Sequence, residues 1–224
     1  MEVSSVKKDG KNFKIEASSG ESFSARTLII ASGKKPRMLN VPGEREYKNK
    51  GVAYCSTCDG PLFAGKTVAV IGGGNSALDA ALAMMKIAKK VYLINIHEKF
   101  IGDAVMQDKV KAAPNVEILA GTKTLEIVGE KFVKGIKVET KGKSLDIALE
   151  GVFIEIGMIP NSDFIDCVEK NEDKEVLIDS ASQTSCPGIF AAGDVTDVPD
   201  KQIIIAAGDG AKASLAAFKY LSTH

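Results

Sequence analysis

The sequence contains no tryptophan, few cysteines and no excess of charge of either sign. Lysine plus arginine equals aspartate plus glutamate at 29 each, so the chain lacks the positive field that binding to nucleic acid or to a membrane surface requires. No apolar run approaches the roughly 20 residues of a transmembrane helix, and the N-terminus lacks the apolar core of a signal peptide. We therefore expect no nucleic-acid partner, no membrane association and a cytoplasmic location.

The 4 cysteines are too sparse for a small disulfide-stapled secreted domain. Two of them, Cys55 and Cys58, form a C-x-x-C motif. A zinc site needs four ligands, and no second closely spaced pair occurs among the remaining candidates, which are Cys167, Cys186, His97 and His224. We therefore expect no metal, and we expect a disulfide of this chain to be a working redox group.

Apolar runs alternate with helical patterns along the 224 residues, which predicts an α/β protein of one large or two modest domains. The expected elements are a hairpin and a buried strand that stops at Gly33, a βαβ unit, a series of short strands, and a final strand followed by a helix. Their ranges are 12–33, 66–96, 116–157, 188–194 and 208–221.

Two segments rich in proline and glycine, 34–51 and 157–163, are typical of connectors between domains. We place the first boundary near Val41 and the second after Gly157. The predicted organisation is thus an inserted domain over residues 41–157.

The strongest signal is VAVIGGGNSA, in which an apolar strand meets three glycines and then an alanine-rich helix. Gly72 suits the tight turn, Gly74 permits close approach of a pyrophosphate, and Ala77 keeps the helix near the strand. The helix begins with Asn75 and Ser76, whose amides are expected to point at the phosphates. This context predicts a dinucleotide-binding site rather than an ordinary strand-to-helix turn.

The choice of nucleotide is made about 20 residues past the glycines, where an acid binds the ribose of NAD and arginines bind the extra phosphate of NADP. Residues 95–99 contain no arginine. Glu98 could bond a ribose and Lys99 could offer a charge, although both residue types are common in solvated loops. The sequence favours NADH over NADPH.

The C-x-x-C motif places two sulfurs within bonding distance across one turn, where one thiol can become an attacking thiolate. Asp59 follows the second cysteine directly. A carboxylate there can give and take the proton that disulfide chemistry requires, although alone it could equally be a turn residue. We interpret Cys55, Cys58 and Asp59 as catalytic.

Six segments together resemble a known family. They are VPGEREY, YCSTCDGPLF, GKTVAVIGGGNSA, GVFIEIGMIPN, GIFAAGDV and KQIIIAAGDGAKAS. The order looks like the low-molecular-weight thioredoxin reductases, and it is also similar to the C-terminal part of the alkyl hydroperoxide reductase flavoprotein subunit. The resemblance runs over nearly the whole chain, and the combination of motifs is highly specific.

The resemblance implies two Rossmann-like three-layer domains. An FAD domain, 1–40 and 158–224, would be interrupted by a pyridine-nucleotide domain, 41–157, that holds the C-x-x-C motif. In the family Cys58 is the sulfur on the flavin side, and Cys55 attacks a thioredoxin or a related redoxin. These reductases are usually homodimers.

The resemblance also implies further cofactor-binding residues. Those expected at the nicotinamide nucleotide are Ile156 and Gly157; those expected at the flavin are Ala31, Ser32, Gly33, Gly193, Asp194, Lys201, Gln202 and Ile203.

The sequence departs from the thioredoxin reductases at two places. Asn95, Ile96 and His97 stand where the family has its NADPH-binding HRR signature, and Ile101 replaces a later arginine. The hydroperoxide reductase branch has an acid at the position of Asn95, so NADH remains favoured, with ferredoxin or a deazaflavin as other donors. The family also starts with a glycine-rich βαβ unit for FAD, and this chain is expected to lack that N-terminal part.

The sequence thus predicts an enzyme of the thioredoxin-disulfide reductase class. Electrons would pass from a nicotinamide cofactor through FAD and the Cys55–Cys58 disulfide to a redoxin. Three alternatives remain: a component like the alkyl hydroperoxide reductase flavoprotein, a nucleotide-binding module without flavin turnover, and a zinc-holding structural protein.

Overall fold

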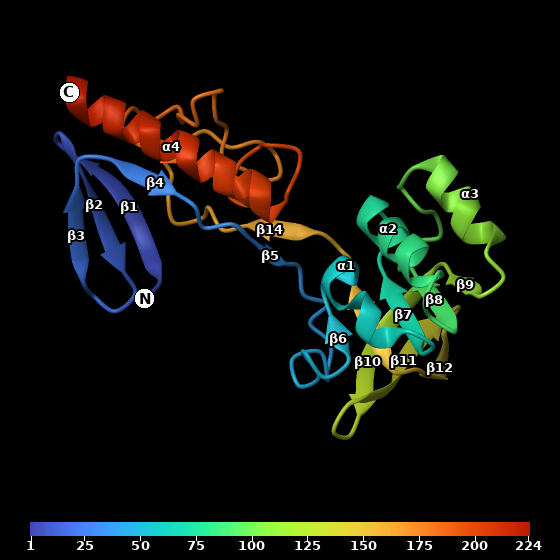
Figure 1. Cartoon of the computed structure of the whole chain (residues 1–224). Coiled ribbons are helices and arrows are strands. Elements are labelled where there is room, and N and C mark those ends of the chain that lie inside the picture. The colour runs from blue at the N-terminus through green and yellow to red at the C-terminus, as the bar shows by residue number, and fades with distance from the viewer. The chain divides into compact units, whose positions relative to one another are not determined.

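The computed structural model describes residues 1–224, which divide into two compact units (Figure 1). Unit 1 comprises Met1–Lys35 and Met158–His224, and unit 2 comprises Pro36–Gly157. The first division falls at Pro36, ahead of the expected Val41. The chain therefore leaves unit 1, builds all of unit 2, and returns.

Unit 2 is built on a sheet of five parallel strands in the order β6-β13-β7-β8-β9. The strands are β6 (Val52–Ala53), β13 (Gly151–Ile154), β7 (Thr67–Ile71), β8 (Lys90–Ile94) and β9 (Val116–Leu119). Their central residues are apolar without alternation because both faces of a parallel sheet are covered. The expected βαβ unit is confirmed as β7, α2 and β8.

One face of this sheet is covered by helices. α2 (Asn75–Met84), α3 (Ala104–Ala112) and the 3-10 turn η1 (Gly60–Phe63) lie on that side. Val68, Val70 and Leu93 of the strands pack there against Leu78 and Met84 of α2. Helix α3 was not expected from the sequence.

The opposite face is covered by an antiparallel sheet of β10 (Thr122–Gly129), β11 (Val133–Thr140) and β12 (Lys143–Ala148). Ile127, Ile136 and Val138 form one cluster with Ile71 and Ile154 of the parallel sheet. Unit 2 is therefore a three-layer α/β domain, which confirms the predicted fold class.

Unit 1 combines a small antiparallel sheet with a parallel strand pair. The sheet contains β1 (Val3–Asp9), β2 (Asn12–Ala17) and β3 (Ser22–Ala25), and the pair contains β4 (Leu28–Ile30) and β15 (Ile189–Ala191). Most of the segment between β14 (Met158–Pro160) and β15 is turns and loops. The hydrophobic core of unit 1 includes Phe13, Ile15, Ile165 and Val176.

Helix α4 (Ile203–Thr223) ends the chain and packs on β15. Ala213 and Ala217 contact Phe190, so small residues bring the helix close to the strand. The helix begins at Ile203 rather than at the expected residue 208. No helix of the chain combines the length and the apolar character needed to cross a bilayer.

The two crossings between the units pair with each other as strands β5 (Lys34–Pro36) and β14 (Met158–Pro160). The N–H of Arg37 donates to the carbonyl of Gly157 at 2.9 Å, and the N–H of Asn161 donates to the carbonyl of Gly33 at 2.9 Å. The segments that proline and glycine marked as connectors thus contribute short strands.

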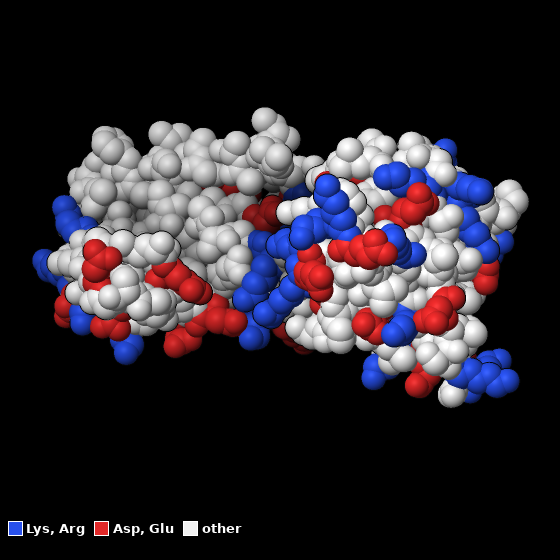
Figure 2. All heavy atoms as spheres, turned by 90° about the horizontal axis from the view of Figure 1, so that it is seen from below, with Lys and Arg blue, Asp and Glu red and all other residues white.

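Acidic and basic side chains are interspersed over the face of unit 2 seen in Figure 2. This distribution matches the balanced composition of the chain. That face therefore presents no extended field of one sign for a polyanionic partner.

Candidate nucleotide and disulfide sites

The glycine turn between β7 and α2 is closely packed at its first two positions. A Cβ added to Gly72, whose φ is +147°, would lie 2.2 Å from the carbonyl oxygen of Glu155 and 2.8 Å from the Cβ of Ala77. At Gly73 it would lie 2.5 Å from the amide nitrogen of Asn95. Only Gly74 faces open space. Gly72 and Gly73 therefore serve the fold, and Gly74 leaves the approach to the helix clear.

The N-terminus of α2 is available to an anion. Gly74 is its N-cap and supplies no side-chain cap. The Asn75 side chain is turned to the loop before α3, where its Oδ1 accepts from the N–H of Asp103 at 2.8 Å. Free first-turn amides and an open glycine fit the phosphates of a dinucleotide.

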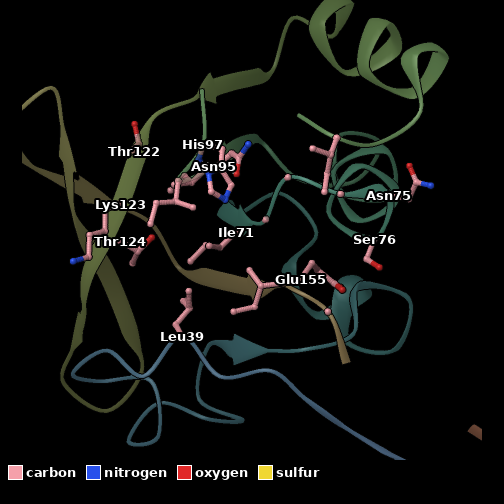
Figure 3. Close-up of a pocket in the computed structure, with 18 of the residues that line it drawn as sticks. Leu39, Ile71, Asn75, Ser76, Asn95, His97, Thr122, Lys123, Thr124 and Glu155 are labelled. Carbon is pink, nitrogen blue, oxygen red and sulfur yellow. Dashed lines mark hydrogen bonds between the residues drawn. The ribbon is translucent and has the colours of Figure 1, made fainter. Parts of the chain in front are cut away.

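A cavity of about 570 Å³ lies in front of this turn (Figure 3). Its walls come from the glycine turn, the ends of β8 and β13, the start of β10 and the segment before β6. The lining includes Leu39, Val41, Ile71, Gly72, Gly74, Asn75, Ser76, Asn95, His97, Lys99, Lys123, Glu155, Ile156 and Gly157. The residues predicted at the nucleotide are thus brought together around one mainly apolar cavity, with two exceptions. Ala77 packs beneath the turn, and Glu98, a candidate for binding the ribose, is exposed and does not line the cavity.

Asn95 holds the loop at one end of this cavity. The side chain is buried, its Oδ1 accepts from the N–H of His97 at 3.3 Å, and its Nδ2 donates to the carbonyl of Lys99 at 3.0 Å. The amide therefore shapes the loop that would receive a ribose. Lys123, on β10, joins Lys99 in the lining, and no sequence pattern indicated it.

The two sulfurs of the C-x-x-C motif are joined in a disulfide, with 5.4 Å between their Cα atoms. Cys55 is the N-cap of α1 (Ser56–Asp59), and its sulfur accepts from the N–H of Cys58 at 3.2 Å. Cys58 is exposed, whereas Cys55 and Asp59 are half-buried. Since each sulfur is bonded to the other, neither is a thiolate ligand for zinc in this state.

The buried carboxylate of Glu44 connects the segment before β6 to Tyr54, the residue that precedes Cys55. Glu44 is 1% exposed and accepts hydrogen bonds from the N–H groups of Leu39 and Asn40 at 3.0 and 2.6 Å. It also accepts from the hydroxyl of Tyr54 at 2.9 Å. Burial is the largest cause that raises the pKa of Tyr54, and the hydrogen bond to Glu44 and the charge of Glu44 raise it as well. Glu44 thereby ties the residue before Cys55 to the Leu39 wall of the cavity.

Glu155 contacts both the cavity and the turn that carries the disulfide. It follows β13, lines the cavity, and accepts from the N–H of Ser56 in α1 at 3.4 Å. Burial and, to a smaller extent, the charge of Asp79 raise the pKa of Glu155 to about 7, against the opposing effect of the Ser56 N–H. No sequence motif indicated this residue.

In unit 1, the predicted flavin residues lie where two neighbouring parallel strands end. Ala31–Gly33 follows β4, and Gly193 and Asp194 follow β15 in the 3-10 turn η2 (Gly193–Val195). The hydroxyl of Ser32 donates to the carbonyl of Asn161 at 2.6 Å, and the Asn161 amide donates back at 2.9 Å. Asn161 therefore fixes the first turn, a role that the sequence motifs did not indicate.

The start of α4 lies in the same unit and is open to a ligand. Gln202 is the N-cap but makes no side-chain capping bond, and Ile203 and Ile204 are 92% and 79% exposed. A half-buried carboxylate at Asp194, an uncapped helix and an exposed apolar pair fit the hydroxyl groups and ring of a flavin.

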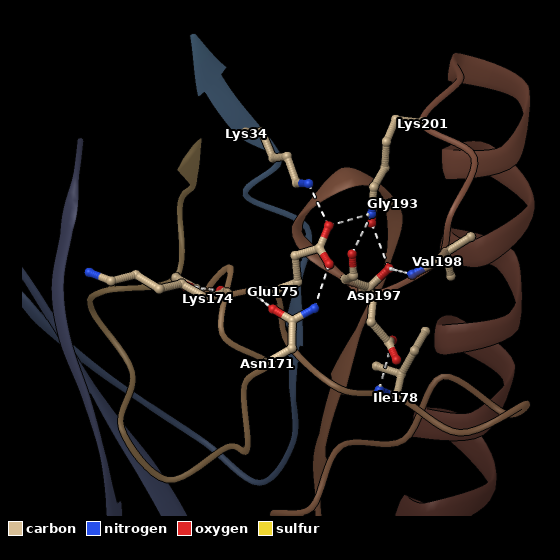
Figure 4. A network of polar contacts seen from close by, with 11 residues as sticks. Lys34, Asn171, Lys174, Glu175, Ile178, Gly193, Asp197, Val198 and Lys201 are labelled. Carbon is tan, nitrogen blue, oxygen red and sulfur yellow. Dashed lines mark hydrogen bonds and ion pairs between the residues drawn. The ribbon is translucent and has the colours of Figure 1, made fainter. Parts of the chain in front are cut away.

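The ammonium group of Lys201 is engaged within the protein (Figure 4). It lies 3.1 Å from Glu175 and donates to the carbonyl of Thr196 at 2.5 Å. Glu175 also pairs with Lys34 at 2.5 Å and accepts from the Asn171 amide at 2.6 Å. This network ties β5 to the segment before α4, and Glu175 was not anticipated.

Glu175 is expected to make the stability of the protein depend on acid pH. Burial would raise the pKa of Glu175, but hydrogen bonds from Lys34, Asn171 and Lys201 outweigh it and lower the pKa from 4.5 to about 2. A lowered pKa stabilises the folded state above the unfolded value, by about 3 kcal/mol here, and this contribution is lost as pH falls from about 4.5 to about 2.

The measurement is denaturant unfolding, followed by circular dichroism, of the wild type, Glu175→Gln and the exposed control Glu172→Gln. Glu175→Gln should lose about 3 kcal/mol at pH 7 and show a flatter profile below pH 4.5. A Glu175→Gln profile parallel to that of the wild type down to pH 2 would contradict the role of the network.

The two remaining cysteines face each other in unit 1. Cys186 is buried in the core and Cys167 is exposed. Burial first, and then the neighbouring Cys186 thiol, raise the pKa of Cys167 to about 11. The Cys167 thiol is therefore protonated at neutral pH, in contrast to the sulfurs of unit 2, which are joined in a disulfide.

Fold and site together define an α/β nucleotide-binding protein with a redox disulfide beside its cavity. Residues 1–211 match the pyridine nucleotide-disulphide oxidoreductase family, and the chain belongs to that family. Membership of the family implies a flavin and a nicotinamide cofactor.

Individual relatives fall into two groups. The chain is 46% identical over 217 residues to an alkyl hydroperoxide reductase subunit of Pseudomonas putida, covering 95% of this chain and 42% of that protein. The corresponding protein of Escherichia coli has the same identity and coverage. Thioredoxin reductase from Streptococcus pyogenes matches with a TM-score of 0.86 and 34% identity, covering 99% of this chain and 74% of the other. The chain thus spans about two fifths of the length of the hydroperoxide reductase subunits.

Proposed function

We propose that this chain forms part of a flavin-dependent disulfide reductase that passes electrons from a nicotinamide nucleotide to a thioredoxin-like protein. The observation that carries the proposal is the Cys55–Cys58 disulfide in the same domain as a glycine-turn cavity. A nucleotide-binding module without turnover would need only the cavity. The reductase is the function that uses the sulfurs, the carboxylates and the cavity together.

The sulfur chemistry follows from the motif. Two electrons and two protons convert the disulfide to two thiols, and the Cys55 thiolate then attacks the partner disulfide, releasing one partner thiolate and forming a mixed disulfide. Attack of Cys58 on the Cys55 sulfur releases the second partner thiolate and restores the starting disulfide. Asp59, which directly follows Cys58, is the proposed group that exchanges protons with these thiols.

The cofactors are assigned to separate units. The amides at the start of α2, with Gly74, would hold the nucleotide pyrophosphate, and Ile156 and Gly157 would line the nicotinamide end. Asp194, the Ala31–Gly33 turn and the start of α4 would hold FAD. When bound, FAD supplies the two-electron exchange between nicotinamide and disulfide.

NADH is the proposed donor. The loop at 95–101 offers no arginine for a 2′-phosphate, and the Asn95 amide is used to hold that loop. Lys99 and Lys123 are the cations near this end of the cavity and are the groups a 2′-phosphate would require.

We expect the wild type to bind NADH more tightly than NADPH. The double variant Lys99→Ala/Lys123→Ala should change the affinity for NADH by less than about twofold, because the ribose of NADH carries no phosphate for the lysines to bind. Fluorescence titration with each nucleotide measures this, with the exposed Lys131→Ala as control. A wild type that prefers NADPH, with a preference lost in the double variant, would reverse the assignment.

The proposed partner is thioredoxin or a related redoxin, and the proposed assembly is a homodimer, as is usual in the thioredoxin reductases that the chain resembles. We also propose a cytoplasmic location. Protein-substrate specificity is determined by surfaces rather than motifs.

A second candidate is a component of an alkyl hydroperoxide reductase. It is favoured by the 46% identity to the Pseudomonas putida hydroperoxide reductase protein, compared with 34% to the Streptococcus pyogenes thioredoxin reductase. The two candidates share all the chemistry described above and differ in the protein that receives the electrons.

The deciding experiment combines a spectrum with turnover. The purified protein should show flavin absorbance that bleaches on addition of NADH, and it should then reduce a thioredoxin-like disulfide. Rates with a thioredoxin and with a hydroperoxide-reducing redoxin separate the two candidates. Failure of the chemically reduced Cys55–Cys58 pair to reduce either redoxin would reject both of them.

A further inference from the structure

Glu155 is placed between the cavity and the disulfide turn. Its N–H donates to the carbonyl of Ile71 at 2.8 Å, and its own carbonyl packs against Gly72, so its backbone is fixed by the glycine turn. Its side chain lines the cavity on the opposite side from Thr122 and Lys123 (Figure 3). The same carboxylate accepts from the N–H of Ser56, the residue that follows Cys55, at 3.4 Å.

Glu155 forms no ion pair, although Lys99 and Lys123 line the same cavity. The glycine turn and Ile156 carry no charge, α1 contributes the Ser56 N–H, and α2 contributes Asp79. Burial is the largest cause of the shift, the Ser56 N–H opposes it, and with the charge of Asp79 the pKa is raised to about 7. The carboxyl group is therefore neutral below neutral pH and anionic above it.

We propose that Glu155 is a positioning residue whose charge controls how readily the reduced Cys55–Cys58 pair forms its thiolate. A thiolate at Cys55 places negative charge one residue from the Ser56 N–H that Glu155 contacts. An ionised Glu155 repels that charge and a neutral one does not. The inference rests on the proposed function in taking this dithiol as the group that attacks the partner.

The test follows alkylation of the reduced protein. Wild type, Glu155→Gln and the exposed control Glu139→Gln are reduced, freed of reductant and treated with iodoacetamide from pH 6 to pH 9.5, and mass spectrometry gives the rate at Cys55. We expect the wild-type rate to show two ionisations, one of them near pH 7. Glu155→Gln should lose the ionisation near pH 7 and react about fivefold faster at pH 8, because a like charge is removed. Glu139→Gln should match the wild type.

Superimposable profiles for wild type and Glu155→Gln would overturn the proposal. If Glu155→Gln does not fold, the wild type alone decides, because a profile without an ionisation near pH 7 is incompatible with a carboxyl that titrates there beside the thiols. The assay needs no flavin, nucleotide or redoxin. A dithiol with the expected profile in a protein that reduces no redoxin would therefore reject the proposed function and leave this inference intact.

Discussion

Replacing either Cys55 or Cys58 by serine is expected to abolish reduction of the partner redoxin, with a loss of roughly a thousandfold or more. The reaction passes through bonds to both sulfurs, and a hydroxyl substitutes for neither. Nucleotide affinity should be unchanged, since neither sulfur lines the cavity. The measurements are redoxin turnover and nucleotide titration, with Cys167→Ser as the control that keeps full turnover.

The two variants also separate the roles of the sulfurs. If Cys55 attacks the partner, Cys58→Ser should accumulate a mixed disulfide with the redoxin that a non-reducing gel detects, and Cys55→Ser should not. Cys58 is the more exposed cysteine of the pair within unit 2, so exposure alone would favour Cys58 as the attacking sulfur. The comparison therefore distinguishes the two assignments. Trapping by Cys55→Ser instead would exchange the assignments, and turnover in both variants would remove the dithiol from the mechanism.

The parts of the site that the sequence predicted are those encoded by neighbouring residues. A strand, three glycines and an alanine-rich helix specify the turn at Gly72 by local geometry, and the C-x-x-C spacing brings Cys55 and Cys58 together within one turn. The three-layer fold follows equally from apolar strands alternating with helices. The glycine turn and the disulfide depend on residues fewer than about a dozen positions apart, where local patterns are informative.

The residues that sequence reasoning missed act across the fold. Glu155 meets Ser56, and Glu175 meets Lys34, over separations that no local pattern records. A lone glutamate at the end of a strand or in a loop is usually solvated, so burial is the property that distinguishes these two, and burial is known only after packing.

The helix errors have a different origin. α3 begins at an Asp103 cap that accepts from the N–H groups of Val105 and Met106, but its surface is mostly polar and only Val110 is buried. Its apolar periodicity is therefore weak. α4 begins earlier than expected because Ile203 and Ile204 belong to its exposed first turn, where no core contact creates a pattern.

The glycine turn provides the second large effect, because adjacent positions separate folding from binding. Gly72→Ala is expected to destabilise unit 2 by about 3 kcal/mol or more, since its Cβ would lie 2.2 Å from a backbone oxygen that cannot rotate away and its φ of +147° disfavours any L side chain. Thermal unfolding by circular dichroism measures the loss.

Gly74→Ala is the matched variant. Its Cβ meets nothing within 4 Å and its φ is −98°, so the fold should lose at most about 1 kcal/mol. The added methyl nevertheless stands where a pyrophosphate must approach the start of α2, so NADH affinity should fall about tenfold or more. Unchanged affinity in a folded Gly74→Ala would place the phosphates elsewhere. If Gly72→Ala and Gly74→Ala were equally stable, Gly72 would not be packed against the carbonyl of Glu155. Glu155 would then not connect the cavity to the disulfide turn.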